Sequence, residues 1–492
     1  MMAVVKGIPR FPARVLILSM ALPFLIPSPF LRGDEKELGS KFGGRNVLFL
    51  AVDDLNDWVG CLGGHPQADT PNIDRLAASG VLFENAHCAA PLCHPSRTAI
   101  LTGLHPSTTG ISGNEAWFRE HPKLGNWVTL PQYFRQHGYL AFTGGKIFHQ
   151  AHGEWSDPDS WDRQYSTKMA TSFPPVKERY SHGMQSEFSN KILARLIDWS
   201  PIDVAKEETE DWMTAMGAAE ILELEHERPF FLACGIYRPH LQWYAPKEFF
   251  DLHPLEQIQL PITLDNDIED VPPLGRRMAA GAFDIIQKNG EWERAVQGYL
   301  ASTSFADACI GHVLDALDAS PHRDNTIVVL FGDHGYQIGE KGRFAKSSLW
   351  QQATRSPLII RVPGNEANGS RCSRPVSLID LYPALIALCG LPERNDLDGR
   401  NIAPLVRNPE TEWPWPAVIT HSPHWHGNNH AIRTERWHYI HYSDGGEELY
   451  DMARDPHQWK NLNEDPDHAA VKEELKQSLP NLNAPHFQGP PN

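Results

Sequence analysis

Ionisable side chains stand at the ends of four short apolar stretches of the sequence. These stretches are 46–54, 139–146, 228–240 and 325–335. Apolar runs of this length that alternate with helical stretches are typical of buried strands in a mostly parallel sheet. The titratable residues at their ends are Asp53, Asp54, Lys146, His149, His240, Asp333 and His334. Because ligands of open α/β sheets bind outside the carboxyl ends of the strands, we expect all four ends to face one crevice.

Three carboxylates in that crevice would need a positive partner. Asp53, Asp54 and Asp333 supply oxygen ligands, which hard divalent cations such as calcium and magnesium prefer. His334 is less suited to a hard cation, so on chemistry alone it is either a ligand of the ion or only its neighbour. The alternative for the paired aspartates is a helix cap or a turn, although the residues that follow, LNDW, carry no evident capping pattern.

Positive side chains near the same crevice predict a site for an anion. Arg97 and Lys146 would lie close to the carboxylates, and Lys346 is a third cation. A metal ion beside fixed cationic side chains suits a tetrahedral oxyanion such as sulfate or phosphate. Lys346 stands within GRFAKSSLW and would be read as a surface lysine from its own context. Its membership of the site therefore does not follow from the neighbouring residues.

A cysteine opens the stretch CHPSRTAILTG at residues 93–103. Pro95 suits the first turn of a helix and Gly103 its end, so we expect Cys93 at a helix N-terminus. Free backbone N–H groups and the positive end of the helix dipole favour an anion there. Cys93 is then either a thiolate nucleophile or a small buried apolar residue, which is the commoner fate of a free cysteine. These residues alone do not decide between the two.

The elements that position these residues are expected to form an α/β fold, in which helices flank a large, mostly parallel sheet. A helix is predicted over 70–80, with Thr70 as its N-cap and a proline in the first turn. Ile310, Val313, Leu314 and Leu317 keep the spacing of a buried helix face.

The pattern of the chain changes after residue 408. A linker rich in Pro and Trp is followed by aromatic alternation over 433–452 with a turn at DGG, which predicts a small antiparallel sheet and then a terminal helix near 467–478. We therefore expect a catalytic domain over 44–408 and a C-terminal subdomain over 409–492.

Charge and cysteine usage limit the partners and the compartment. The chain has 44 Lys and Arg against 61 Asp and Glu, a net charge of −17, which argues against nucleic acid and against a stable membrane partner. Residues 1–33 place basic residues before the apolar run VLILSMALPFLI, which predicts a signal peptide and export, with a retained N-terminal anchor as the alternative. The seven cysteines have no C-x-x-C spacing, which excludes a zinc ribbon. The six besides Cys93 could pair in an oxidising compartment.

The stretch LCHPSRTAILTG resembles the C-x-P-S-R signature of the type I sulfatases. Further landmarks of that family stand in the same order: VDDL, TPNIDRLAASGVLFENAHC, LPQYFRQHGYLAFTGGKIFH, YRPH, GDHG and ELYDMARDPHQWKNL. The GGKIFH spacing and the Asp-His pair are most similar to the iduronate-2-sulfatase branch. The resemblance covers roughly residues 45–465. It implies the fold of alkaline phosphatases and sulfatases, and an enzyme that removes sulfate from a sulfated carbohydrate, such as a glycosaminoglycan or another sulfated polysaccharide.

The resemblance also implies a modified residue and a metal ion. Cys93 would be oxidised by a formylglycine-generating or equivalent maturation enzyme to formylglycine (3-oxoalanine). In its hydrated form one hydroxyl attacks sulfur and the second allows sulfate to be expelled. One calcium ion per chain would be held by Asp53, Asp54, Asp333, His334 and the modified Cys93.

The remaining functional residues are assigned by the same resemblance. Arg97 would steady the modified residue and the charge beside the metal. Lys146 and Lys346 would hold sulfate oxygens. His149 would be the base that assists sulfate release, and His240 would protonate the departing sugar oxygen.

Two other functions remain open from the sequence. One is a hydrolase of phosphodiesters or phosphonate monoesters that uses the same formylglycine, against which the KIFH spacing counts. The other is a non-catalytic glycan-binding homologue in which Cys93 stays a thiol, against which the complete set of metal and lysine residues counts. The histidine run HSPHWHGNNH at 421–430 is interpreted as a surface loop and not as a second metal site.

Overall fold

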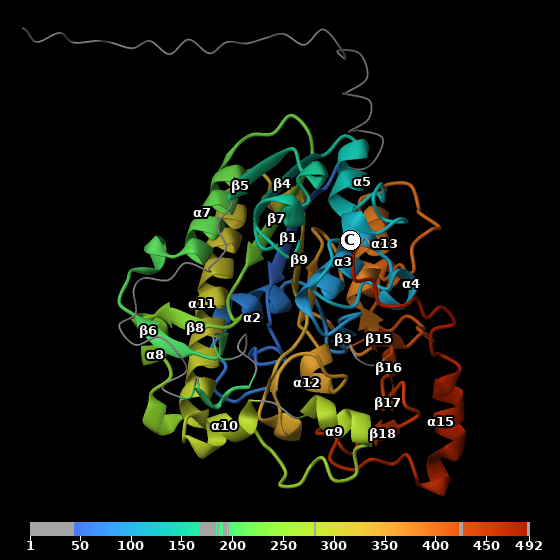
Figure 1. The fold of residues 1–492 in the computed structure, drawn as a ribbon. Helices are drawn as coiled ribbons and strands as arrows, with labels where there is room; N and C mark the ends of the chain where they lie inside the picture. The colour runs from blue at the N-terminus through green and yellow to red at the C-terminus, as the bar shows by residue number, and fades with distance from the viewer. Residues whose placement is uncertain are drawn as a thin grey trace, which may run out of the picture.

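The computed structural model describes residues 44–166, 184, 186–189, 194, 196–279, 282–422 and 427–489. The signal segment expected at 1–33 and residues 423–426 of the histidine run lie outside the described residues. An eight-stranded sheet runs through the centre of the molecule, in the order β13-β2-β12-β9-β1-β7-β4-β5 (Figure 1). The sequence predicted such a sheet from its alternating apolar runs.

The strands of this sheet are β1 (Asn46–Val52), β2 (Val81–Phe83), β4 (Leu140–Gly145), β5 (Arg163–Ser166), β7 (Phe230–Ile236), β9 (Thr326–Gly332), β12 (Leu358–Arg361) and β13 (Arg371–Cys372). β1 pairs in parallel with β7 on one side and β9 on the other, and β7 pairs in parallel with β4. Within this sheet β12 is antiparallel to both of its neighbours. The prediction of a large, mostly parallel sheet is confirmed.

Helices cover both faces of the sheet, because alternate residues of each strand point to opposite sides. Along β1, Val47 and Phe49 pack into one hydrophobic cluster, whereas Leu48 and Leu50 pack into another. The helices are α2 (Pro71–Ala78), α3 (Cys93–Thr102), α4 (Pro106–Thr109), α5 (Leu130–Gln136), α7 (Glu210–Glu223), α8 (Lys247–Asp251), α9 (Pro273–Ala279), α10 (Phe283–Lys288), α11 (Trp292–Ala319), α12 (Gln351–Thr354), α13 (Leu381–Leu388), α14 (Ala403–Arg407) and α15 (Ala469–Lys476). Figure 1 shows α7 and α11 on one side of the sheet and α3, α5 and α13 on the other.

The predicted helices are present with small differences at their ends. α11 buries Ile310, Val313, Leu314 and Leu317, as their spacing indicated. Thr70 precedes α2, but its hydroxyl does not cap that helix: it accepts a hydrogen bond from the Gly60 N–H at 2.8 Å instead.

The helix that begins at Cys93 is fixed at its end by glycine. α3 stops at Gly103, whose φ of 70° lies in the left-handed region that glycine adopts at little cost. A Cβ at this position would also lie 2.9 Å from Leu397, so the close packing requires glycine as well. The predicted course of this helix from residue 93 to its glycine stop is confirmed.

The C-terminal region forms a four-stranded antiparallel sheet. Its strands are β15 (Ala417–His421), β16 (Asn429–Arg433), β17 (Trp437–His441) and β18 (Glu447–Asp451). The DGG turn joins β17 to β18, and α15 lies within the predicted terminal helix. The sheet begins at Ala417, earlier than the stretch 433–452 on which it was expected, because β15 pairs with β16 along its whole length.

Buried polar contacts attach this sheet to the rest of the molecule. The Glu448 carboxylate is fully buried and accepts hydrogen bonds from Trp350 Nε1 at 2.9 Å and Tyr442 OH at 2.5 Å. A carboxylate without solvent needs such donors, so Glu448 ties β18 to the segment before α12.

Small strand pairs and the chain's last described segment complete the fold. The pairs are β3 (Ala86–His87) with β14 (Val376–Ser377), β6 (Trp199–Ile202) with β8 (Trp243–Pro246), and β10 (Gln337–Ile338) with β11 (Phe344–Ala345). The end of the chain returns to the neighbourhood of α3 (Figure 1), where the N–H groups of Ala484 and Phe487 donate to the carbonyls of Ser107 and Gly110 at 2.8 and 2.9 Å.

Two further expectations concern cysteines and membranes. All seven cysteines lie in the described residues and none forms a disulfide, so the six besides Cys93 are not paired. Among the helices of the described residues, none is both long and apolar enough to span a bilayer.

Candidate active site

The carboxyl ends of the four central strands meet at one place, as the sequence predicted. β9, β1, β7 and β4 are direct neighbours in the sheet. The backbone N–H groups of Asp53, Lys146 and Asp333 each donate to a carbonyl of the adjoining strand, at 3.1, 3.2 and 3.1 Å. The sheet ladder therefore continues into the site and fixes where these three side chains begin.

Asp53, Lys146 and Arg97 form a buried group at the ends of β1 and β4. Lys146 Nζ donates to Asp53 Oδ2, and Arg97 Nη2 lies 3.5 Å from Asp53 Oδ1. Arg97 Nη1 donates to the backbone carbonyls of Lys146 and Ile147, the latter at 3.1 Å. Burial alone would raise the pKa of Asp53, but the positive charges around it, of which Lys146 is the strongest, together hold this pKa well below its ordinary value.

A second group surrounds the cysteine. Lys346 Nζ lies 2.6 Å from Asp54 Oδ1 and 3.0 Å from Cys93 Sγ, and that sulfur lies 4.0 Å from the same carboxylate oxygen. Although burial disfavours its charge, Asp54 raises the pKa of Lys346 well above its ordinary value. Lys346 comes from the loop after β11, so the structure brings it into the site although its sequence context indicated the surface.

Asp333 joins the two groups. Its Oδ2 accepts from Arg97 Nε at 2.7 Å, and its Oδ1 accepts from the backbone N–H groups of Asp54 and His334 at 3.1 and 3.0 Å. Both oxygens of Asp333 are thus engaged within the protein.

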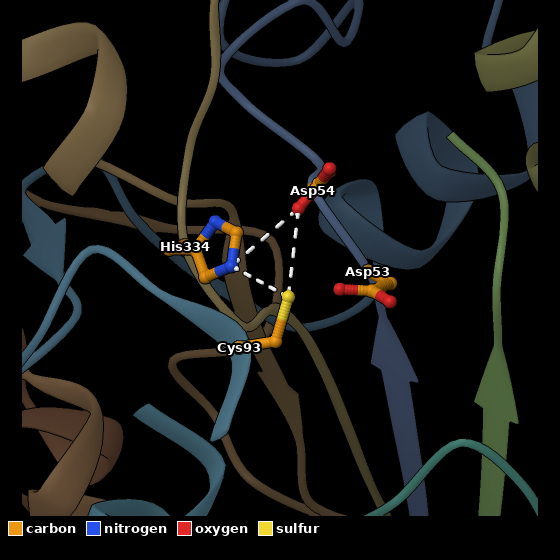
Figure 2. Close-up of side chains that lie close together, drawn as sticks. All are labelled: Asp53, Asp54, Cys93 and His334. Carbon is orange, nitrogen blue, oxygen red and sulfur yellow. Dashed lines mark hydrogen bonds and ion pairs between the residues drawn. The ribbon is translucent and has the colours of Figure 1, made fainter. Parts of the chain in front are cut away.

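His334 faces the cysteine. Its Nε2 lies 3.3 Å from Cys93 Sγ and 3.4 Å from Asp54 Oδ1, and its Nδ1 lies 2.9 Å from the Gly335 carbonyl, to which it donates. Burial alone would lower the pKa of His334, yet the neighbouring Asp333 raises it to about 9. Figure 2 shows His334, Asp54 and Cys93 pointing toward one another, with Asp53 alongside.

Cys93 is almost completely buried at the first position of α3. Its neighbours are charged, so the surroundings are not those of an apolar core cysteine. The next residue is held from outside the helix, because the backbone N–H of His94 donates to Asn114 Oδ1 at 3.2 Å.

Two further predicted residues, His149 and His240, line the same region. His240 Nε2 lies 3.9 Å from Asp54 Oδ2, and its Nδ1 lies 2.6 Å from the Leu241 carbonyl, to which it donates. Burial, reinforced by Lys346, lowers the pKa of His240 well below its ordinary value. Burial, reinforced by Lys146, lowers the pKa of His149 to about 2. Both imidazoles are therefore neutral near pH 7.

The donor set fits a divalent cation. One ligand atom from each of Asp53, Asp54, Cys93 and His334 lies within 4.8 Å of every other, and all four residues are buried. Asp53 Oδ1 and Asp54 Oδ2 are buried without a hydrogen-bond partner, so both oxygens are available as ligands of a cation. As a thiol, Cys93 makes this a set of the kind that zinc binds, whereas an oxygen in place of the sulfur would make it suitable for calcium.

Several supporting residues were not predicted from the sequence. Tyr299 OH donates to the Asp54 carbonyl at 2.8 Å, and Ser96 Oγ donates to the Asp333 carbonyl at 2.5 Å. Tyr299 lies on the buried face of α11, where the helical spacing marks it as core and nothing indicates its contact with Asp54.

Comparisons with known proteins identify related families. The model described as "Sulfatase" matches residues 45–391, and the model described as "N-sulphoglucosamine sulphohydrolase, C-terminal" matches residues 339–485. A protein of Formosa agariphila named "Sulfatase" is 36% identical over 92% of this chain and 89% of its own length. The iduronate 2-sulfatase of Mus musculus is 35% identical over 70% of this chain and 69% of its own length.

Solved structures share the fold at lower identity. One, in complex with its substrate D-glucosamine-2-N,6-O-disulfate, superposes with a TM-score of 0.70 at 21% identity and covers 88% of this chain and 96% of its own. The phosphonate monoester hydrolase of Agrobacterium radiobacter superposes with a TM-score of 0.71 at 22% identity and covers 90% and 96%.

Proposed function

Because this chain belongs to the sulfatase family, whose members hydrolyse sulfate esters, we propose that it removes sulfate from a sulfated saccharide. The reaction uses a formylglycine made from Cys93 and one calcium ion. One observation carries the proposal: two lysines and two aspartates converge on a single buried cysteine at a helix N-terminus.

The groups that would complete the site have separate tasks. Hydrated formylglycine at position 93 supplies one hydroxyl to attack sulfur and a second that allows sulfate to leave. A calcium ion held by Asp53, Asp54, Asp333, His334 and the modified residue supplies positive charge for the sulfate oxygens. The two carboxylate oxygens without hydrogen bonds support Asp53 and Asp54 as members of that ligand set.

The lysines bind the sulfate group. An ammonium has three N–H donors. Lys146 uses one on Asp53, whereas Lys346 uses one on Asp54 and one on Cys93 Sγ. The others are free to hold sulfate oxygens and to stabilise the charge that develops as the ester bond breaks. Arg97 donates to the backbone carbonyl of Lys146, which keeps Lys146 in place, and its positive charge neutralises Asp333.

His149 acts as the base for release of sulfate. In the described state its low pKa leaves the imidazole neutral but weakly basic, so accepting a proton from position 93 requires an anion bound beside it to raise that pKa. Its Nδ1 is buried without a hydrogen-bond partner in the described structure, and so no competing contact occupies that atom.

His240 protonates the departing sugar oxygen through Nε2. In the described state Nδ1 carries the proton, and Nε2 faces the Asp54 carboxylate. An anionic ester bound beside it would favour the protonated imidazole, since opposite charges raise the pKa of a histidine. The general-acid task therefore requires the substrate to be in place.

The substrate class follows from the relatives. The proposal places the chain near the iduronate-2-sulfatase branch, which is consistent with the mouse relative, and a sulfated saccharide is consistent with the glucosamine disulfate bound to the solved relative. The direct test is sulfate release by the purified protein from a panel of sulfated mono- and disaccharides, with Cys93→Ala as the inactive control. Turnover by Cys93→Ala equal to that of the unchanged protein would refute the proposal.

A second candidate function is hydrolysis of phosphonate monoesters or phosphodiesters. The likeness of the fold to that of a phosphonate monoester hydrolase favours this second function. Parallel assays on a sulfate ester and a phosphonate ester with the same alcohol would separate the two. If kcat/KM is higher for the phosphonate ester than for the sulfate ester, the protein is a phosphonate hydrolase and not a sulfatase.

Three further assignments are part of the proposal. Residues 44–408 form the catalytic domain and 409–492 the C-terminal subdomain, supported by the sheet that starts at Ala417. The protein is exported by its N-terminal segment, and a maturation enzyme converts Cys93 before folding, since that cysteine is buried in the folded protein. N-terminal sequencing of secreted protein would test the first 33 residues.

A further inference from the structure

Arg343 holds the loop that carries Lys346. Its Nε and Nη2 donate to the Lys346 carbonyl at 3.2 and 2.6 Å, and Nη2 also approaches the Ser347 carbonyl at 3.3 Å. The guanidinium therefore holds the backbone of Lys346, the residue whose side-chain ammonium lies beside Cys93. Arg343 is 8% exposed, so these bonds are shielded from water.

The same arrangement occurs at the other lysine. Arg97 donates to the carbonyls of Lys146 and Ile147, as Arg343 does to those of Lys346 and Ser347. In both cases the arginine donates hydrogen bonds to the backbone carbonyl of the lysine and to the backbone carbonyl of the residue that follows it. Because a planar guanidinium presents several donors in a fixed fork, each lysine has its backbone position and direction set by an arginine.

The two arginines differ in their counter-ions. Arg97 forms ion pairs with Asp53 and Asp333. In the described part of the chain, no carboxylate oxygen lies within 4.0 Å of a nitrogen of Arg343. Among the described residues the charge of Arg343 thus has no carboxylate partner, and it stands next to the lysine that is assigned to the anion.

Other restraints on the loop lie after Lys346, where the buried Ser348 Oγ donates to Gln337 Oε1. Ser347 has a φ of 65°, in the left-handed region that serine seldom adopts, and its N–H donates to the Pro91 carbonyl at 2.9 Å. β11, which precedes Lys346, is only two residues long and pairs with the equally short β10. Without a long strand behind it, the loop relies on Arg343 to keep Lys346 aimed at Cys93.

We propose that Arg343 is the positioning residue for Lys346, the counterpart of Arg97 for Lys146, and that it adds positive charge behind the sulfate site. The inference rests on the proposed function, since it assigns Lys346 to sulfate binding. Arg343 acts through Lys346 and is not expected to touch the reacting atoms.

Two substitutions separate the effect of the paired N–H donors of Arg343 from the effect of its positive charge. Arg343→Lys keeps the charge and loses the paired donors, and Arg343→Met loses both. Hydrogen bonds that involve a charged group contribute about 1.5–3 kcal/mol, which corresponds to roughly 10- to 100-fold. We expect kcat/KM for a sulfated disaccharide to fall about 10-fold in Arg343→Lys and about 100-fold in Arg343→Met. Arg454→Lys, on an exposed arginine of the C-terminal region, is the matched control and should be unchanged.

A double-mutant cycle shows whether Arg343 acts through Lys346. If it does, Arg343→Lys, which removes only the paired donors, should cost less than about 3-fold in a Lys346→Ala background and its full effect in a Lys146→Ala background, because coupled residues are not additive and independent ones are. Binding of inorganic sulfate to full-length protein carrying Cys93→Ser, measured by calorimetry, should follow the same pattern without requiring turnover. Thermal unfolding of each variant checks that it is folded.

Each outcome decides the inference. An equal loss in the Lys346→Ala and Lys146→Ala backgrounds, or sulfate binding unaffected by Arg343→Met, would overturn it even if the enzyme is an active sulfatase. If the unchanged protein releases no sulfate, the proposed function fails instead, while sulfate binding by the Cys93→Ser protein still decides whether Arg343 supports Lys346.

Discussion

Two groups of side chains meet at Cys93, and they are built differently. The Asp53 group contains Asp53, Lys146, Arg97 and His149; the Asp54 group contains Asp54, Lys346, Arg343 and His240. In the Asp53 group the lysine directly follows β4, and its side chain is 3% exposed. In the Asp54 group the lysine lies on a loop after a two-residue strand, and its side chain is 16% exposed.

The difference shows two ways of placing the same chemistry. In the Asp53 group the sheet ladder fixes Asp53 and Lys146, because their N–H groups extend the pairing of neighbouring strands. In the Asp54 group a loop lysine depends on Arg343 and on Pro91. We expect the Asp53 group to contribute more to stability, and the Asp54 group to tolerate movement of the substrate.

The largest loss of activity is expected when a ligand of the calcium ion shared by the two groups is removed. Asp54→Ala and Asp333→Ala should each lose bound calcium and reduce turnover about 10³-fold or more, since the remaining carboxylate charge no longer neutralises the ion and the ion is worth several kcal/mol to the transition state. Metal content by mass spectrometry and sulfate release measure the two losses. A full equivalent of calcium in both variants would show that these carboxylates are not its ligands.

The next effect distinguishes the histidines of the two groups. His240→Ala should lower turnover of a sulfated sugar by roughly 10²–10⁴-fold and that of an aryl sulfate much less, because a sugar alkoxide needs a proton to leave and a nitrophenolate does not. His149→Ala should slow both substrates alike and let sulfated enzyme accumulate, because it acts after the alcohol has left. Steady-state rates on both substrates, with intact-protein mass, provide the comparison. Equal losses on both substrates for His240→Ala would remove it from the acid role.

A smaller effect concerns the lysines. Lys146→Ala and Lys346→Ala should each reduce kcat about 10²–10³-fold, the usual cost of one lost donor to a developing negative charge. Their stabilities should differ: with calcium chelated, Lys146→Ala should lower the free energy of unfolding by about 3–5 kcal/mol, as expected for a broken buried ion pair. Lys346→Ala should lower it clearly less, because its partner Asp54 already has a raised pKa and can accept a proton. Chemical denaturation measures both, and equal losses would contradict the contrast between the groups.

Much of the Asp53 group could be predicted from the residues themselves. The apolar runs that become β1 and β4 precede Asp53 and Lys146, and the run that becomes β9 precedes Asp333, which joins the two groups. The topology of parallel strands brings such positions together. The fold class follows from the same alternation of strands and helices.

The Asp54 group could be predicted only in part, because Asp54 and His240 follow apolar runs, whereas Lys346 and Arg343 do not. Lys346 follows no buried strand of the main sheet, and only the family resemblance placed it in the site. Arg343 and Tyr299 act through backbone carbonyls, and such contacts depend on tertiary packing that no local spacing reveals. The early start of the C-terminal sheet at Ala417 was missed for a similar reason, since β15 is defined by its partner β16.

The central claim is that Cys93 works as formylglycine and not as a thiol. Mass spectrometry of the peptide that spans residue 93 gives the fraction converted to the aldehyde, and the same preparations give the specific activity on a sulfated disaccharide. Activity should rise in proportion to the converted fraction and extrapolate to zero for the thiol form. Full activity from protein in which every residue 93 remains a cysteine would contradict it.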